Sequence, residues 1–232
     1  MIPLKDENPT RNKSYIRLLI LIICSIVFIL QLTNDNREFY TYYFGFKPAS
    51  LIGNNELPTF FAPLTLISSL FMHGGWMHFL GNMLYLWIFA DNVEDIMGKK
   101  RFIIFYISSG VIACFSQAIV NFNSTIPMIG ASGSIAGVLG AYLHLFPKAK
   151  ILVLVPFFIF FTLRISAFYL LLFWFIYQFI NLGGQGSNVA WFAHIGGFIF
   201  GFLYSLFFVR KVNLKTVKKG KSIFLKKKGP WN

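Results

Sequence analysis

The amino-acid sequence predicts an all-α, polytopic membrane protein, a bundle of six transmembrane helices. Three observations lead to this class. The chain of 232 residues is 56% hydrophobic and only 12% charged, which is too apolar for one water-soluble core. It contains six mostly apolar stretches near the length of about 20 residues that crosses a bilayer. Its 21 Lys and Arg residues, against 8 Asp and Glu, gather mainly in alternate connections between these stretches.

The six apolar stretches define the domain organisation. Cations precede the first stretch as they do in a secretory signal, but no small-residue cleavage site follows it, so we interpret it as a retained helix. We expect an N-terminal segment at 1–14, a six-helix domain at 15–209 and a basic tail at 210–232. The expected helices lie at residues 15–32, 76–96, 102–122, 130–146, 165–181 and 190–209.

The distribution of basic residues predicts the orientation in the membrane. Cytoplasmic loops collect Lys and Arg, whereas the connections 121–129 and 182–189 carry no charge. Both termini are therefore expected in the cytoplasm, and the membrane is expected to be the plasma membrane if the source is bacterial. The basic tail serves topology and attraction to anionic lipid, so no nucleic-acid partner is expected.

Two apolar segments fall outside the six helices. Counting residues 151–163 as another crossing would place the basic tail outside, so we expect this segment to lie along the cytoplasmic face or dip into it. Arg164 would then reach the interface at the start of the fifth helix. The aromatic segment 33–75 is expected to be an outer loop resting in the outer leaflet.

Four polar residues inside these helices are candidates for function, since polar groups are costly in lipid. Ser132, His194, His78 and Asn82 come from three different helices. At about 1.5 Å rise per residue, all four lie at similar shallow depths in the outer half of the bilayer. His78 and Asn82 are four residues apart and share one helix face.

Small residues beside these candidates explain how the helices could meet. Gly133 and Gly137 form one GxxxG pair close to Ser132, and residues 197 and 201 form another beside His194. Such pairs allow close packing of helices in lipid. The alternative is an ordinary glycine interface with a serine that bonds back to the preceding turn.

The chemistry of these residues indicates a Ser–His dyad. A serine becomes a strong nucleophile when a neighbouring base, here His194, takes its proton. His78 and Asn82 could donate hydrogen bonds to the oxyanion that forms on a carbonyl. No Asp or Glu follows Asp95, so no acidic third member is expected.

The remaining polar residues have structural interpretations. We expect His73 to support the site by hydrogen bonding, His144 to be interfacial, and Glu94 to tie its helix to nearby loop cations. Cys24 and Cys114 lie inside predicted helices and are expected to be packing residues.

Three motifs resemble the rhomboid family of intramembrane serine proteases. They are "HGGWMHFLGNMLYLWIFADNVEDIMG" from residue 73, "GASG" around Ser132 and "AHIGGFIFG" around His194. The resemblance covers residues 15 to 209. It implies that Ser132 is the nucleophile and His194 the base, and that Asn82, His78 and the Ser132 backbone N–H line the oxyanion hole.

The resemblance also implies an activity: the cleavage of substrate transmembrane segments near their outer ends, with no cofactor and no metal. The expected partners are transmembrane substrates and the lipid bilayer. Where some bacterial members have a tyrosine that stacks on the histidine, this chain has Ala136, and a Trp-Arg pair found in the first loop of some members is absent.

Three alternatives remain open at this stage. The first is a catalytically silent rhomboid-like protein that binds transmembrane clients. The second is a transport or metal site built from His73, His78 and His194. The third concerns the aromatic residues 168–179, which are either bulk facing the lipid or a movable gate beside the site.

Overall fold

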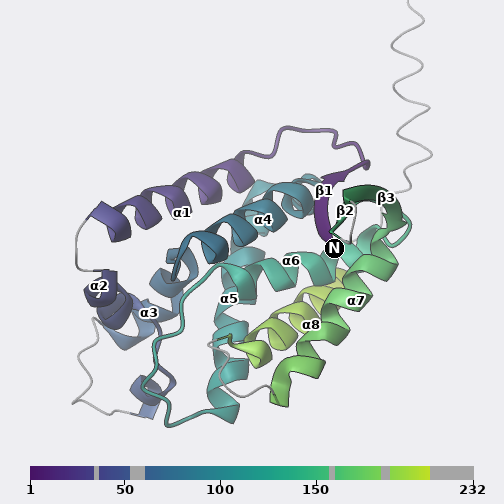
Figure 1. The fold of residues 1–232 in the computed structure, drawn as a ribbon. Coiled ribbons are helices and arrows are strands. Elements are labelled where there is room, and N and C mark those ends of the chain that lie inside the picture. Colours follow the sequence, from purple (N-terminus) through teal and green to yellow (C-terminus); the bar gives the residue numbers. More distant parts are fainter. Residues whose placement is uncertain (34–36, 53–60, 157–159, 184–188, 210–232) are drawn as a thin grey trace, which may run out of the picture.

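Six long helices form the body of the protein in the computed structural model (Figure 1). The structure describes residues 1–33, 37–52, 61–156, 160–183 and 189–209. Each of the six ranges predicted from the sequence overlaps one of these helices, and the ends agree to within three residues. They are α1 (Tyr15–Thr33), α4 (Trp76–Met97), α5 (Lys99–Val120), α6 (Ser132–Leu145), α7 (Ala167–Ile180) and α8 (Trp191–Phe208).

Within the described residues, three of these helices are long and apolar enough to cross a bilayer, namely α1, α5 and α8. The α7 helix is apolar but has only 14 residues, and α6 also has 14. The α4 helix has 22 residues but carries His78, Asn82 and Asp91 among its apolar side chains. The chain is thus a mostly helical membrane protein, and the count of six crossings stays a prediction.

The α6 helix lies at the centre of the bundle. Every residue from Gly133 to Tyr142 is buried. The helix packs against α8, α5 and α4, and Figure 1 shows it between α4 and α8. Many of its buried residues are Gly, Ala or Ser, which allow neighbouring backbones to come close and make many van der Waals contacts in lipid.

A three-stranded antiparallel sheet at one end of the bundle corrects the expected all-α class (Figure 1). Its order is β1 (Ile2–Asp6), β2 (Lys150–Pro156) and β3 (Phe160–Ser166). The described residues of the expected membrane-face segment 151–163 therefore belong to two paired antiparallel strands, β2 and β3. As expected, they do not add a helical crossing.

The residues of β2 explain why this segment is extended. Ile151 and Val153 are buried whereas Leu152 between them is partly exposed, which is the two-residue alternation of a strand with one covered face. Its β-branched residues also favour strands. The edge partner β1 comes from the far N-terminus, a pairing between distant segments that a local pattern does not reveal.

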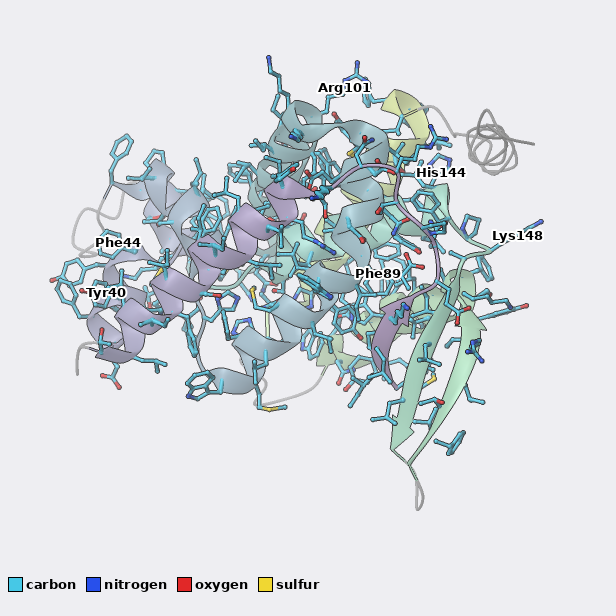
Figure 2. The ribbon with its side chains drawn as sticks, turned by 90° about the horizontal axis from the view of Figure 1, so that it is seen from above. Tyr40, Phe44, Phe89, Arg101, His144 and Lys148 are labelled. Atoms are coloured by element: carbon cyan, nitrogen blue, oxygen red, sulfur yellow. The ribbon has the colours of Figure 1, made fainter. Side chains whose placement is uncertain are left out.

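The opposite end of the bundle carries the short helices of segment 33–75. In place of one long loop the structure has α2 (Arg37–Phe44), η1 (Pro48–Ile52), α3 (Ala62–Ser68) and η2 (Ser69–Phe71). Residues 34–36 and 53–60 of the predicted loop lie outside the described residues. Figure 2 shows Tyr40 and Phe44 at this end and His144 and Lys148 at the other.

Both cysteines are buried free thiols, in agreement with the expected packing role. Cys24 lies on α1 and Cys114 on α5. The predicted basic tail, 210–232, lies outside the described residues.

Candidate active site

Ser132 and His194 meet across the interface between α6 and α8. Ser132 is the first residue of α6, and its Oγ lies 2.9 Å from Nε2 of His194 in the first turn of α8. This is hydrogen-bonding distance between a hydroxyl and an imidazole nitrogen. At this distance the imidazole can accept the proton of the serine hydroxyl.

Glycines bring these two helices together, as the sequence predicts. A Cβ on Gly197 would collide with the carbonyl oxygen of Gly133, and one on Gly201 would collide with that of Gly137. The other side of α6 is equally close to α5, because a Cβ on Gly137 would also meet the side chain of Ser109. Backbone contact with α8 on one side and side-chain contact with α5 on the other fix the start of α6 relative to α8.

The imidazole of His194 is held from its other side by α7. Nδ1 of His194 lies 2.9 Å from Oε1 of Gln178, a residue that is only 2% exposed. Nε2 of the same Gln178 amide donates to the backbone carbonyl of Trp174 at 2.7 Å. The ring centroids of Trp174 and Trp191 lie 5.9 and 6.0 Å, respectively, from the ring centroid of His194.

His78 on α4 faces the strand-like segment that leads into α6. A Cβ built on Gly130 would lie 2.6 Å from Nε2 of His78 and 3.6 Å from Oγ of Ser132, so both side chains border the same point. Gly130 has a φ of +128°, which L side chains rarely adopt. The Gly74 N–H donates to Nδ1 of His78 over 3.4 Å, so Nδ1 is the acceptor nitrogen of the neutral ring. Nε2, which faces the site, then carries the proton.

Asn82 lies one helical turn further along α4. The residue is 8% exposed, and within the described structure its buried Nδ2 has no hydrogen-bond partner. A buried amide donor without a partner normally costs free energy, so Asn82 can donate to a group that enters the site.

His73 contributes through its ring rather than through the hydrogen bond that the sequence analysis expected. Its ring packs edge-on against that of His78, with 5.3 Å between centroids, and against Phe79 at 5.4 Å. Its backbone N–H donates to Oε1 of Gln31 on α1 at 3.0 Å. His73 therefore helps to fix the position of His78.

His144 lies near the far end of α6 from Ser132. Its Nδ1 lies 3.0 Å from Oγ of Ser205 on α8, so it joins the two helices a second time. Among the described residues, no group of three His, Cys, Asp or Glu side chains is arranged to hold a metal ion.

Glu94 has a structural role, but its partners differ from the loop cations that the sequence analysis expected. Its two carboxylate oxygens accept the backbone N–H groups of Ile16 at 3.0 Å and Arg17 at 2.8 Å. These are unpaired donors in the first turn of α1, where a negative charge is also favoured by the helix dipole. Arg164 is likewise not at the start of a helix: it lies on β3 and pairs with Glu7 at 2.6 Å.

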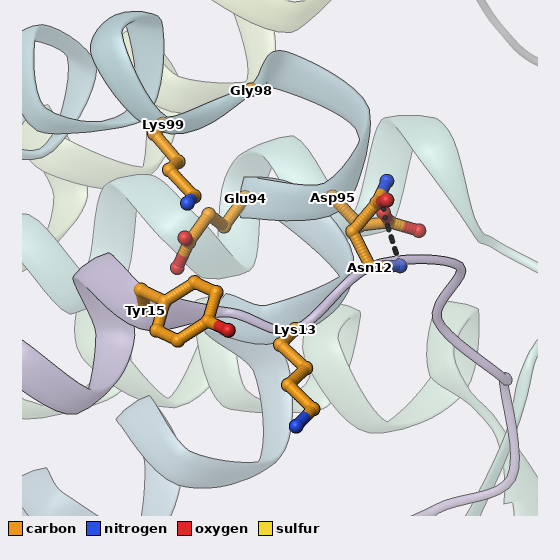
Figure 3. A pocket seen from close by; sticks show the side chains of 7 residues that line it. All are labelled: Asn12, Lys13, Tyr15, Glu94, Asp95, Gly98 and Lys99. Atoms are coloured by element: carbon orange, nitrogen blue, oxygen red, sulfur yellow. Dashed lines mark hydrogen bonds between the residues drawn. The ribbon is translucent and has the colours of Figure 1, made fainter.

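A polar hollow of about 420 Å³ lies beside the contact between Glu94 and the start of α1 (Figure 3). The Asn12 side chain donates to Asp95 there, and Lys99 lies over the ring of Tyr15. The hollow lies at the end of α4, about four turns from His78, so it is not part of the Ser132 site. Its lining residues are Asn12, Lys13, Tyr15, Glu94, Asp95, Gly98 and Lys99.

The fold and the site together describe a helical membrane protein with a hydrogen-bonded serine and histidine between two closely packed helices. The model of the Rhomboid domain matches residues 62–211, more than half of the chain. The chain belongs to the rhomboid family.

Three curated relatives illustrate the range of the match. Yeast (Saccharomyces cerevisiae) Rhomboid protein 1, mitochondrial, is 28% identical over 72% of this chain and 47% of its own length. Zebrafish (Danio rerio) Presenilin-associated rhomboid-like protein A, mitochondrial, is 32% identical over 61% of this chain and 36% of its own length. The rhomboid-family protein YdcA of Bacillus subtilis is 30% identical over 63% of this chain and 67% of its own length.

These matches limit which properties of the relatives can be assigned to this chain. The chain spans half or less of the length of the first two relatives. The family and the apolar helices make this an integral membrane protein. Because the matched names include mitochondrial proteins, the comparisons do not support the expected bacterial plasma membrane over a mitochondrial one.

Gln178 is the residue of the site that the sequence analysis missed. The residue that holds the histidine in a catalytic triad is usually an acid, and Gln178 is an amide. The signal that could have found it is in the sequence, since Gln178 is the one amide in the apolar stretch "FYLLLFWFIYQF". A polar side chain in such a stretch indicates a specific partner.

Proposed function

We propose that this protein is an intramembrane serine endopeptidase that hydrolyses peptide bonds in or near the outer end of substrate transmembrane segments. The observation that carries the proposal is the 2.9 Å separation between Ser132 Oγ and His194 Nε2. Membership of a family that includes serine proteases supports it.

In the proposed reaction, His194 takes the Ser132 proton as the hydroxyl oxygen attacks the carbonyl carbon of the scissile bond. The carbonyl oxygen becomes an oxyanion. It would be stabilised by the unpartnered Nδ2 of Asn82, by Nε2–H of His78 and by the backbone N–H of Ser132 at the start of α6.

Collapse of this intermediate breaks the C–N bond, and protonated His194 returns its proton to the leaving amine. The product is an acyl ester on Ser132. Water then attacks the ester with His194 again acting as base, which releases the second product and restores the serine. No cofactor or metal enters this scheme.

The proposed arrangement in the membrane follows from the charge distribution. Six helices cross the bilayer, and the sheet end, with β1 and the start of α5, faces the cytoplasm. Ser132 then lies toward the outer surface, where water can reach it. The partners are transmembrane substrates and lipid. A substrate helix would have to unwind before its carbonyl reached Ser132, since its backbone groups are already hydrogen-bonded.

The decisive experiment incubates the purified protein in detergent with a model transmembrane substrate, beside its Ser132→Ala variant. Cleavage by the wild type alone, together with labelling of Ser132 by a fluorophosphonate probe, would support the proposal. A folded wild type that binds the substrate without cleaving it would instead be a catalytically silent member of the family. Cleavage retained by Ser132→Ala would remove Ser132 from the mechanism.

A further inference from the structure

We propose that Gln178 is the third, positioning member of the site: its amide fixes the tautomer and orientation of His194 so that Nε2 faces Ser132 unprotonated. This inference rests on the proposed function and adds to it a residue from a third helix, α7. It begins with a hydrogen-bond chain of four groups: the Trp174 carbonyl, the Gln178 amide, the His194 ring and the Ser132 hydroxyl.

The direction of this chain follows from which groups can donate. The Trp174 backbone carbonyl can only accept, so the end of the Gln178 amide that faces it at 2.7 Å must be the NH₂ group. The amide oxygen then faces His194 at 2.9 Å. Turning the amide over would place two acceptors against each other at Trp174, so the helix backbone determines the orientation of the side chain.

The same reasoning fixes the proton on the imidazole. An amide oxygen can only accept, so Nδ1 of neutral His194 must carry the ring proton. Nε2 is then unprotonated and faces the Ser132 hydroxyl at 2.9 Å as its acceptor. This is the tautomer that a general base needs, and the hydrogen bond at one ring nitrogen sets the state of the other.

Burial makes this arrangement specific. Gln178 is 2% exposed, so water does not compete freely for its amide. The rings of Trp174 and Trp191 approach the imidazole from two directions, at interplanar angles of 36° and 89°. In proteases with a triad, a carboxylate holds the histidine; here a neutral amide takes its place.

The choice of an amide has a chemical consequence. A carboxylate beside Nδ1 would stabilise the protonated imidazole, which cannot accept the serine proton. An amide oxygen orients the ring with much less stabilisation of the charged form, because it carries only a partial charge. Gln178 therefore supplies orientation without placing a full negative charge beside His194.

Two substitutions of Gln178 separate positioning from packing. Gln178→Met keeps the length of the side chain and removes the acceptor, and we expect kcat to fall about 10–100-fold, as when other groups that orient a functional histidine are removed, with little change in KM. Gln178→Glu keeps an acceptor for Nδ1 of His194 and adds a charge, but it loses the amide donor to the Trp174 carbonyl. We expect it to retain more activity than the Met variant at pH 8 and to lose activity on acidification at a pH higher by about 1–3 units.

The control is Gln117→Met on α5, which removes an amide elsewhere in the bundle. Circular dichroism and thermal unfolding in detergent establish that each variant is folded. Two results would overturn the inference: Gln178→Met as active as Gln117→Met, or equal losses in the Met and Glu variants with an unmoved pH midpoint. The first result would mean that Gln178 only fills space.

A separate measurement distinguishes failure of this inference from failure of the proposed function. Nitrogen NMR of protein labelled at its four histidines, with a His194→Asn variant for assignment, reads the tautomer without any turnover. We expect His194 to be protonated at Nδ1 in the wild type and to lose this preference in Gln178→Met. An unchanged tautomer contradicts the inference even if the protein cleaves substrate, and the expected change supports it even if no substrate is cleaved.

Discussion

Gly201 on α8 lies directly against the backbone of Gly137 on α6. A Cβ on Gly201 would overlap the Gly137 carbonyl oxygen and lie only 2.6 Å from its Cα. Backbone atoms cannot turn aside as a flexible side chain can, so a larger residue forces the helices apart. Because Ser132 and His194 lie on the same two helices, this contact also controls the separation of the site residues.

The first prediction compares the same substitution at two glycines. Gly201→Ala should destabilise the protein by about 1–3 kcal/mol through overpacking. Gly81→Ala should be neutral or stabilising by up to about 1 kcal/mol, since it favours the helix and a Cβ there meets nothing within 4 Å. The measurement is unfolding in mixed micelles with increasing SDS. Equal stability of the two variants would refute the tight contact of α6 with α8.

Much of the bundle could be predicted from the sequence because its signals are local. Apolar stretches of sufficient length mark the helices, and small residues at intervals of four mark the interface of α6 with α8. The positions of Ser132 and His194 along their helices predict that they meet, and the structure brings them to 2.9 Å. Their catalytic roles stay predictions.

The missed features depend on contacts between distant segments. The sheet forms because residues 2–6 pair with 150–156, and neither segment reveals the other. Glu94 caps α1 from a helix far along the chain, which charge pattern alone does not distinguish from an ion pair. The expectation of an acidic partner for His194 leaves out Gln178, although an amide oxygen can hold an imidazole as a carboxylate does.

The second prediction concerns the dyad. Ser132→Ala and His194→Ala should each abolish cleavage of a model transmembrane substrate, because the two groups act as one unit. The double variant should be no worse than either single variant. Folding is verified by an unchanged thermal transition. Losses in the two single variants that multiply in the double variant would mean that the two residues act independently.

The third prediction concerns pH and the attachment of the N-terminal strand. Burial raises the pKa of the Asp6 carboxyl to about 7 from its usual 3.8, and the nearby Asp91 and Glu7 act in the same direction. Hydrogen bonds from Tyr142 and the Asn8 backbone oppose the rise without cancelling it. When β1 is paired with β2 (docked), Asp6 therefore keeps its proton at pH values between about 4 and 7. When β1 is detached (undocked), Asp6 loses its proton in this range.

The sign of the effect follows from linkage. The docked state holds more protons than the undocked state between about pH 4 and pH 7, so docking weakens as the pH rises through this range and is constant above it. Protection factors of the β1 amides from hydrogen exchange should be higher at pH 5.5 than at pH 8. In Asp6→Asn the difference should disappear. Stronger protection at pH 8 in the wild type would contradict the raised pKa.

The fourth prediction concerns the substrate. A helical segment must unwind to present its carbonyl to Ser132, so residues that weaken helices near the outer end should favour cleavage. We expect a segment with Gly and Ala there to be cleaved faster than the same segment with Leu at those positions. Rates are compared in one detergent at equal substrate occupancy. Equal rates would show that unwinding is not limiting.

The last prediction separates Asn82 from the dyad. Its Nδ2 is buried and, within the described structure, has no partner, which fits a donor reserved for the oxyanion. Losing one such donor costs up to about 10²–10³ in rate, and the other proposed donors remain. Asn82→Ala should therefore leave weak cleavage where Ser132→Ala leaves none.

A second substitution at the same position tests the sign of the charge. Asn82→Asp has nearly the same shape but replaces the donor with a carboxylate, which would repel the developing oxyanion, so it should be slower than Asn82→Ala above pH 7. The control is Asn121→Ala at the exposed end of α5, which should retain wild-type rates. Initial rates are measured with a fluorescent substrate under single-turnover conditions, so that product release does not mask the chemical step. If Asn82→Asp equals or exceeds Asn82→Ala in rate, the amide is a packing element and the oxyanion is held by His78 and the backbone.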